Sequence, residues 1–185
     1  MSDLKQKIIK FEYEQNFKDD DFYVSKSNEH VFKLLNKWPK WEKNFLNIYG
    51  EKFSGKSHLI NIFLKKFNGF KIDSASLTND ILKKIKIYQN IVIENVKSDI
   101  DEKLFYTLFN IIDQDNKYLV LTSIEPIVNI KFRLDDLKSR FKNFLLFNIE
   151  KPDDELMFAL ILKNLSDRQI SLDKKLINYI IKRIE

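Results

Sequence analysis

Hydrophobic residues recur along the chain in short runs that alternate between the period of a strand and the period of a helix. Short apolar runs of the kind found in buried strands occur at five places. They cover residues 44–49, 70–73, 91–93, 118–122 and 144–149. Between and after them, apolar residues spaced three and four apart predict helices. These helices cover residues 56–67, 77–86, 101–113, 134–141, 153–165 and 172–184.

Strands that alternate with helices predict an α/β fold, in which helices flank both faces of a five-stranded, mostly parallel sheet. Ligands bind such sheets at the carboxyl ends of the strands. Gly50, Glu94 and Thr122 all lie at predicted strand ends, so we expect them to share one site. Asp153 and Ser171 are the residue types that cap helices, and they are the predicted N-caps of the last two helices.

Composition and charge narrow the class of protein. The 185 residues are 44% hydrophobic, which is enough for a compact domain with its own core. The chain has no cysteine, which excludes disulfides and fits a cytoplasmic location. The N-terminus alternates charged and apolar residues, unlike a signal peptide. No apolar run approaches the roughly 20 residues that span a bilayer, so no membrane association is expected.

The net charge of +5 has two interpretations. A basic surface that binds nucleic acid is one of them. The other is a general compositional bias, because the excess is almost all lysine and is spread along the whole chain. We favour the second, since no cluster of basic residues stands out.

Residues 50–57 read G-E-K-F-S-G-K-S and match the phosphate-binding loop G-x-x-x-x-G-K-[ST] in full. The loop's N–H groups and the start of the next helix form a concavity that binds anions. Lys56 is expected to reach the β- and γ-phosphates of ATP or ADP, and the Ser57 hydroxyl to coordinate Mg²⁺. The predicted nucleotide-binding residues here are Gly50, Glu51, Lys52, Phe53, Ser54, Gly55, Lys56, Ser57 and His58.

Two further strand ends offer side chains to this site. Glu94 is predicted to hold Mg²⁺, partly through water, although a plain strand-end carboxylate is the alternative. Asn95 follows where a hydrolysing site needs a base, and an amide cannot accept a proton. We therefore expect weak or absent intrinsic hydrolysis. Thr122 is expected to bond near the γ-phosphate or the attacking water, and a turn-forming hydroxyl is the alternative reading.

The chain resembles DnaA and the shorter DnaA regulatory inactivator (Hda-type) proteins of alphaproteobacteria along nearly its whole length. The similar blocks are residues 22–28, 38–41, 121–126, 136–141, 152–156 and 168–170. The resemblance implies a P-loop AAA+ (ASCE) core over residues 21–150. It also implies a tail over 1–20 and a partial helical lid over 151–185. Val24 and Asn28 would then lie beside the adenine.

The block at residues 136–141 resembles the one that carries the arginine finger in this family. Such an arginine stabilises charge on the phosphoryl group at a neighbouring subunit's site. Arg140 is therefore a candidate catalytic residue that acts in trans. A surface ion pair is the alternative role.

Residues 6–11, Q-K-I-I-K-F, are similar to peptides that bind the DNA polymerase III β sliding clamp. Gln6 would bond at the rim of the clamp's site, and Ile9 and Phe11 would fill apolar pockets. The start of a helix or strand of the fold is the alternative.

The resemblance implies a regulator of replication initiation that promotes hydrolysis of DnaA-bound ATP together with the clamp. An autonomous ATPase or helicase loader, and a clamp-binding scaffold without hydrolysis, remain open. The chain ends at Glu185, before the family's sensor-2 arginine and helix-turn-helix domain, so sequence-specific DNA binding is not expected. The oligomeric state is open, with a homo-oligomer among the options.

Overall fold

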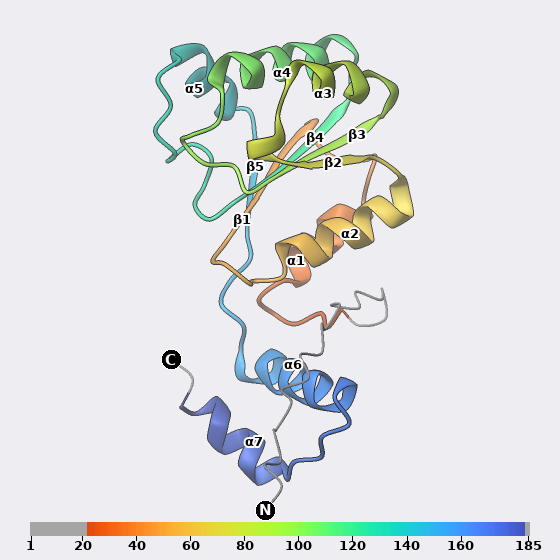
Figure 1. The fold of residues 1–185 in the computed structure, drawn as a ribbon, viewed down its shortest axis with the longest axis vertical. Coiled ribbons are helices and arrows are strands. Elements are labelled where there is room, and N and C mark those ends of the chain that lie inside the picture. Colours follow the sequence, from red (N-terminus) through yellow and green to blue (C-terminus); the bar gives the residue numbers. More distant parts are fainter. Residues whose placement is uncertain (1–21, 184–185) are drawn as a thin grey trace, which may run out of the picture.

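The computed structural model describes residues 22–183, and its core is a parallel sheet between two layers of helices (Figure 1). The strands are β1 (Phe45–Tyr49), β2 (Phe70–Asp73), β3 (Asn90–Glu94), β4 (Tyr118–Ser123) and β5 (Leu145–Asn148). They pair in parallel in the order β2-β3-β4-β1-β5. The predicted α/β fold with a five-stranded parallel sheet is confirmed.

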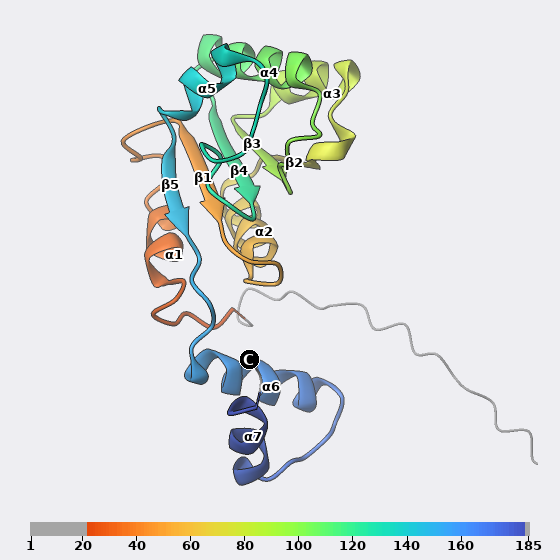
Figure 2. The same ribbon diagram turned by 90° about the vertical axis from the view of Figure 1, so that its left-hand side faces the viewer.

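Helices cover both faces of the sheet, and two more lie beyond it (Figures 1 and 2). One face carries α1 (Glu29–Asn36) and α2 (Lys56–Phe67). The other carries α3 (Asn79–Lys84), α4 (Glu102–Gln114) and α5 (Asp135–Phe141), with short 3₁₀ turns at Ser74–Ser76 and Ile85–Ile87. The chain leaves β5 towards α6 (Asp154–Asp167) and α7 (Lys174–Ile181), below the sheet in the view of Figure 1.

Alternation along the buried strands creates two hydrophobic cores. Ile91 and Ile93 of β3 point to the face that holds Phe109 of α4. Val92, between them, joins Ile60 of α2 on the opposite face. Branched residues suit strands that are covered on both sides, which is why these short runs read as strands in the sequence.

Two predicted helical regions and one predicted N-cap differ from the structure, and the other predicted N-cap is confirmed. Helix α1 was not predicted, although its buried residues Val31 and Leu35 are spaced four apart. The single helix expected over 77–86 is α3 followed by the 3₁₀ turn. The Asp153 cap is confirmed, since its carboxylate accepts a bond from Leu156 N at 2.8 Å. The Ser171 cap is wrong, because Asp173 caps α7 instead.

A buried amide in strand β1 fixes the loop after β4. Asn47 is fully buried, and its Nδ2 donates to Leu121 O at 3.3 Å and to Ser123 Oγ at 2.9 Å. Its Oδ1 accepts from Ile127 N at 2.8 Å. Because buried backbone donors need partners, this one side chain holds the loop against the sheet.

We expect Asn47→Ala to lower the free energy of unfolding by about 2–3 kcal/mol, because Ile127 N–H then stays buried without an acceptor. Chemical denaturation measures the change. Asn44→Ala is the control, since it removes only an exposed bond to Asn116. That loss should stay below about 1 kcal/mol. Equal losses for the two variants would contradict this account.

Candidate nucleotide-binding site

Three strand ends meet at one edge of the sheet, where the sequence predicts a shared site. Gly50 N donates to Ser123 O at 3.3 Å, which joins the end of β1 to β4. Val96 N donates to Thr122 O at 2.8 Å, which joins the chain after Glu94 to β4. The phosphate loop therefore lies next to the ends of β3 and β4.

The loop between β1 and α2 follows a path that two of its residues allow because they are glycines. A Cβ on Gly50 would lie 2.6 Å from the carbonyl oxygen of Ile149. Gly55, at the start of α2, has a φ of 90°. Phe53 also has a positive φ of 64°, and its side chain is fully exposed. A bulky residue adopts that conformation at a cost of about 1–2 kcal/mol, and such strain is typical of functional loops.

The ammonium of Lys56 lies inside this loop. Its Nζ donates to Gly50 O at 2.8 Å, to Glu51 O at 2.6 Å and to Ser54 Oγ at 3.2 Å. Burial lowers the pKa of Lys56, and the negative charge of Glu94 acts in the opposite direction. A partly desolvated positive charge inside a loop of this type suits a polyphosphate, because the backbone N–H groups of such a loop also bind anions.

The segment before α1 lies against the start of α2. The ring of Phe22 contacts the ring of His58 edge-on, with 5.2 Å between centroids. The Asn28 side chain donates to Tyr23 O at 3.1 Å and accepts from Ser25 N at 3.0 Å. Asn28 therefore shapes the turn.

Val24 is 39% exposed, so it is open to a ligand. The contacts predicted for Val24 and Asn28 with adenine stay predictions.

The end of β3 carries Glu94 and Asn95, and both side chains have partners. Glu94 Oε2 pairs with Lys71 Nζ at 3.2 Å, whereas Oε1 is buried without a hydrogen bond from the described residues. Asn95 Nδ2 donates to Asp73 Oδ2 at 2.6 Å. Asn95 N donates to Thr122 Oγ1 at 3.1 Å, so the predicted Thr122 hydroxyl orders the end of β3.

These donors fit a magnesium ion with few protein ligands. The Ser57 hydroxyl and the unpaired Glu94 oxygen are of the kind that Mg²⁺ prefers. Over residues 22–183, no three acidic or histidine side chains gather into a metal-binding group. Nucleotide phosphates and water would therefore supply most of the coordination.

Arg140 on α5 lies away from this loop. Its guanidinium donates to the Asp113 carboxylate and to Asn110 Oδ1, the latter at 2.7 Å, and covers the ring of Tyr106. Asp113 is near the end of α4, shortly before β4 begins, so this cluster lies at the amino edge of the sheet. Arg140 is therefore on the opposite edge from the phosphates that its own loop would bind.

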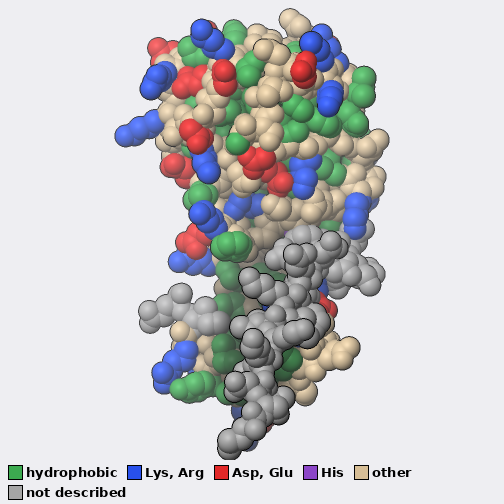
Figure 3. Space-filling view, in the orientation of Figure 1, with side chains coloured by type: hydrophobic (Ala, Val, Ile, Leu, Met, Phe, Trp, Pro, Cys, Tyr) green, Lys and Arg blue, Asp and Glu red, His purple; other side chains and the backbone are tan. Residues whose placement is uncertain are grey.

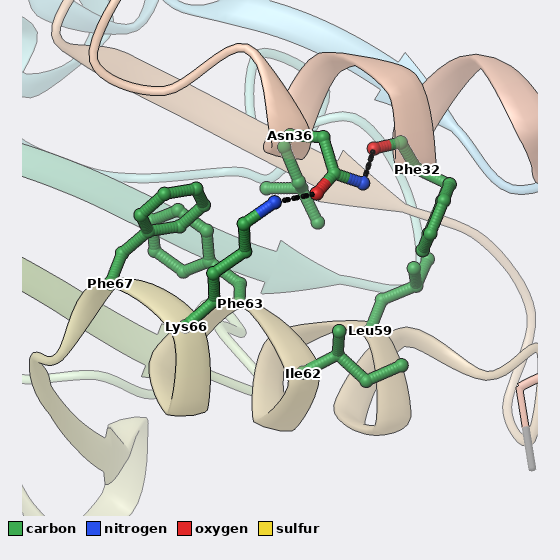
Figure 4. Close-up of a pocket in the computed structure, with 8 residues that line it drawn as sticks. Phe32, Asn36, Leu59, Ile62, Phe63, Lys66 and Phe67 are labelled. Atoms are coloured by element: carbon green, nitrogen blue, oxygen red, sulfur yellow. Dashed lines mark hydrogen bonds between the residues drawn. The ribbon is translucent and has the colours of Figure 1, made fainter. Parts of the chain in front are cut away.

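Two surface features do not add to the site. Lys and Arg side chains are interspersed with Asp and Glu on the face seen in Figure 3. An apolar groove between α1 and α2, shown in Figure 4, is bridged by a bond from Lys66 Nζ to Asn36 Oδ1 at 2.8 Å. Because it runs beside the later turns of α2 and not at the phosphate loop, we do not assign it to the nucleotide.

Two predicted features need separate mention. Gln6, Ile9 and Phe11 of the clamp-binding motif lie outside the described residues, so that motif stays a prediction. Among the helices of residues 22–183, none is long and apolar enough to cross a bilayer.

Comparison with known proteins agrees with this geometry. No protein-family model matches the chain. It is 28% identical to the chromosomal replication initiator protein DnaA of Borreliella afzelii, over 98% of this chain and 44% of that protein. It is 29% identical to DnaA of Helicobacter hepaticus, over 89% of this chain and 41% of that protein. The chain thus spans less than half the length of these relatives.

A solved structure of DnaA from Aquifex aeolicus bound to AMPPCP superposes with a TM-score of 0.72 at 20% identity, over 90% of this chain and 60% of that one. The chain therefore shares the fold of that DnaA structure. Its phosphate loop, Glu94 and Thr122 lie at the carboxyl edge of the sheet, as expected for the fold. Sequence reasoning missed Lys71 and Asp73, which flank the end of β3 on the neighbouring strand β2.

We expect Lys56→Ala to weaken ADP and ATP binding by at least about 100-fold with the fold retained, because a charge-assisted contact to phosphate is lost. Fluorescence anisotropy of a labelled nucleotide measures this. Lys84→Ala is the matched control, since Lys84 is an exposed lysine at the end of α3, outside the phosphate loop. Comparable binding by Lys56→Ala and the wild type would contradict the assignment of the site.

Proposed function

We propose that this chain is a nucleotide-binding regulator of chromosomal replication initiation, which promotes hydrolysis of DnaA-bound ATP together with the sliding clamp. The observation that supports this most is a complete phosphate loop beside an end of β3 that carries Asn95 and not a second acid. Such a site holds a nucleotide without turning it over efficiently. The bound nucleotide then distinguishes one state of the regulator from another, and its hydrolysis does not power mechanical work.

Slow intrinsic hydrolysis follows from the chemistry of Asn95. A general base must accept a proton from the attacking water, and an amide cannot do so. The amide nitrogen of Asn95 is also engaged with Asp73 at 2.6 Å. Asp73 is tied in turn to Ala75 N at 3.0 Å, so the pair is anchored on both sides.

We expect the exchange Asn95→Asp with Asp73→Asn to raise intrinsic ATP hydrolysis by about 100-fold, the low end of what a positioned base contributes. The exchange moves the carboxylate to the end of β3 and keeps an amide–carboxylate pair. Single-turnover hydrolysis of bound ATP measures the rate. Asp73→Asn alone should stay at the wild-type rate, and equal rates for all three proteins would contradict the role given to position 95.

The trans-acting role falls to Arg140. It lies at the amino edge of the sheet, and its side chain is 28% exposed, so a neighbouring subunit can reach it. Contacts to Asp113 and Asn110 hold the planar group in place, which suits an arginine and not a lysine. The likeness to DnaA proteins makes a DnaA subunit the proposed neighbour, and its ATP the proposed target.

We expect Arg140→Ala to abolish the acceleration of hydrolysis of DnaA-bound ATP, since arginine fingers contribute about 10³-fold or more to such reactions. The assay follows labelled ATP on DnaA from the same organism, with and without clamp loaded on DNA. Arg133→Ala is the control, because Arg133 is exposed just before α5.

The proposed binding to the sliding clamp depends on Gln6, Ile9 and Phe11. Replacing both Ile9 and Phe11 by alanine should abolish the part of the acceleration that depends on the clamp. Any acceleration measured without the clamp should stay unchanged. An absence of any acceleration by a protein that binds nucleotide would contradict the proposed function. It would instead favour a helicase loader or a scaffold.

A further inference from the structure

A lysine that no sequence pattern singles out lies against the predicted magnesium ligand. Lys71 is on the edge strand β2, and its Nζ is 3.2 Å from Glu94 Oε2. The same ammonium donates to Asn61 Oδ1 at 2.7 Å, on the face of α2 one turn after Ser57. Strand β2, helix α2 and strand β3 therefore converge on one positive charge beside the phosphate loop.

This ion pair is more enclosed than the Lys83–Asp80 pair at the surface. The Glu94 side chain is 11% exposed and that of Lys71 is 33% exposed, whereas Lys83 and Asp80 are about four-fifths exposed in their pair. A pair that is partly shielded from water interacts more strongly than an exposed one. Asn61 adds a second anchor for the ammonium, so the charge is held in one place.

The position of this charge affects any nucleotide in the loop. A bare Glu94 carboxylate would repel the phosphates, and a divalent cation normally cancels that repulsion. Here the ammonium of Lys71 already cancels the carboxylate. The positive charge of Lys56, inside the loop, is then available to attract the phosphates.

We propose that Lys71 takes over part of the electrostatic role of magnesium, so that the chain binds ADP or ATP with little dependence on Mg²⁺. The inference rests on the nucleotide binding of the proposed function. It does not depend on the proposed effect on DnaA-bound ATP. Lys71 is a positioning and charge-balancing residue here, since it contacts Glu94 and not the predicted path of the phosphates.

The test measures the dissociation constant of labelled ADP in excess Mg²⁺ and in EDTA. For the wild type we expect the two values to agree within about threefold. Lys71→Met should weaken binding by about tenfold or more in EDTA and far less in Mg²⁺, because the Glu94 carboxylate is then uncompensated. Lys71→Arg should behave as the wild type. Lys83→Met, which breaks the Lys83–Asp80 pair away from the site, is the matched control and should leave both values unchanged.

Glu94→Gln provides a second, independent readout. Removing the carboxylate leaves the Lys71 charge uncompensated, so binding in EDTA should become tighter than in the wild type. The double variant Lys71→Met with Glu94→Gln should return to a small Mg²⁺ dependence. If Lys71→Met fails to fold, the Glu94→Gln result alone decides.

Two results would overturn the inference. One is a wild type that loses more than about tenfold in affinity when Mg²⁺ is removed. The other is that the single variants Lys71→Met and Glu94→Gln both keep the wild-type ratio of the dissociation constants in EDTA and in Mg²⁺. In both cases ADP still binds, so the proposed nucleotide site survives. A wild type that binds no nucleotide under either condition would overturn the proposed function and this inference together.

Discussion

The arrangement at the carboxyl edge of the sheet depends on holding the desolvated ammonium of Lys56 inside the phosphate loop. Three oxygen atoms of the loop accept its hydrogen bonds, and they can do so only because the backbone turns sharply after β1. That turn needs Gly50, where any side chain would meet the Ile149 carbonyl. The turn also depends on the position of β1 between β4 and β5, because the ends of these two strands flank the loop on either side. A parallel sheet with this strand order therefore creates the binding site as well as the core.

The neighbouring strand end is organised by charge neutralisation. Glu94 is balanced by Lys71, and Asn95 is paired with Asp73, so neither position presents a free acid to water. A site of this kind binds phosphate through the loop and lacks the base that hydrolysis requires. The same physical feature supports both the slow turnover and the low demand for a divalent cation that we propose. Arg140, the residue proposed to act on a neighbouring subunit, lies at the far edge of the sheet, away from the loop proposed to hold the chain's own nucleotide.

The sequence predicts the parts of this structure that depend on local pattern. Buried strands such as β3 and the phosphate loop are contiguous, so a single sequence reveals them. The interactions that it does not reveal depend on register between segments. Lys71 meets Glu94 only because β2 and β3 pair with Asp73 opposite Glu94. The sequence likewise does not reveal the hydrogen-bond partners of Asn47, because they depend on the position of the loop after β4. Helix α1 buries just Val31 and Leu35, which is too short a stripe to stand out.

The most direct measurement is an experimental structure of this chain crystallised with ADP. We expect the phosphates on the N–H groups of residues 53–57, with Lys56 Nζ turned from the carbonyls of Gly50 and Glu51 towards the β-phosphate. Lys71 should stay paired with Glu94. A loop that remains closed on Lys56 at saturating ADP, or a nucleotide bound elsewhere, would contradict the claim that this edge is a nucleotide site.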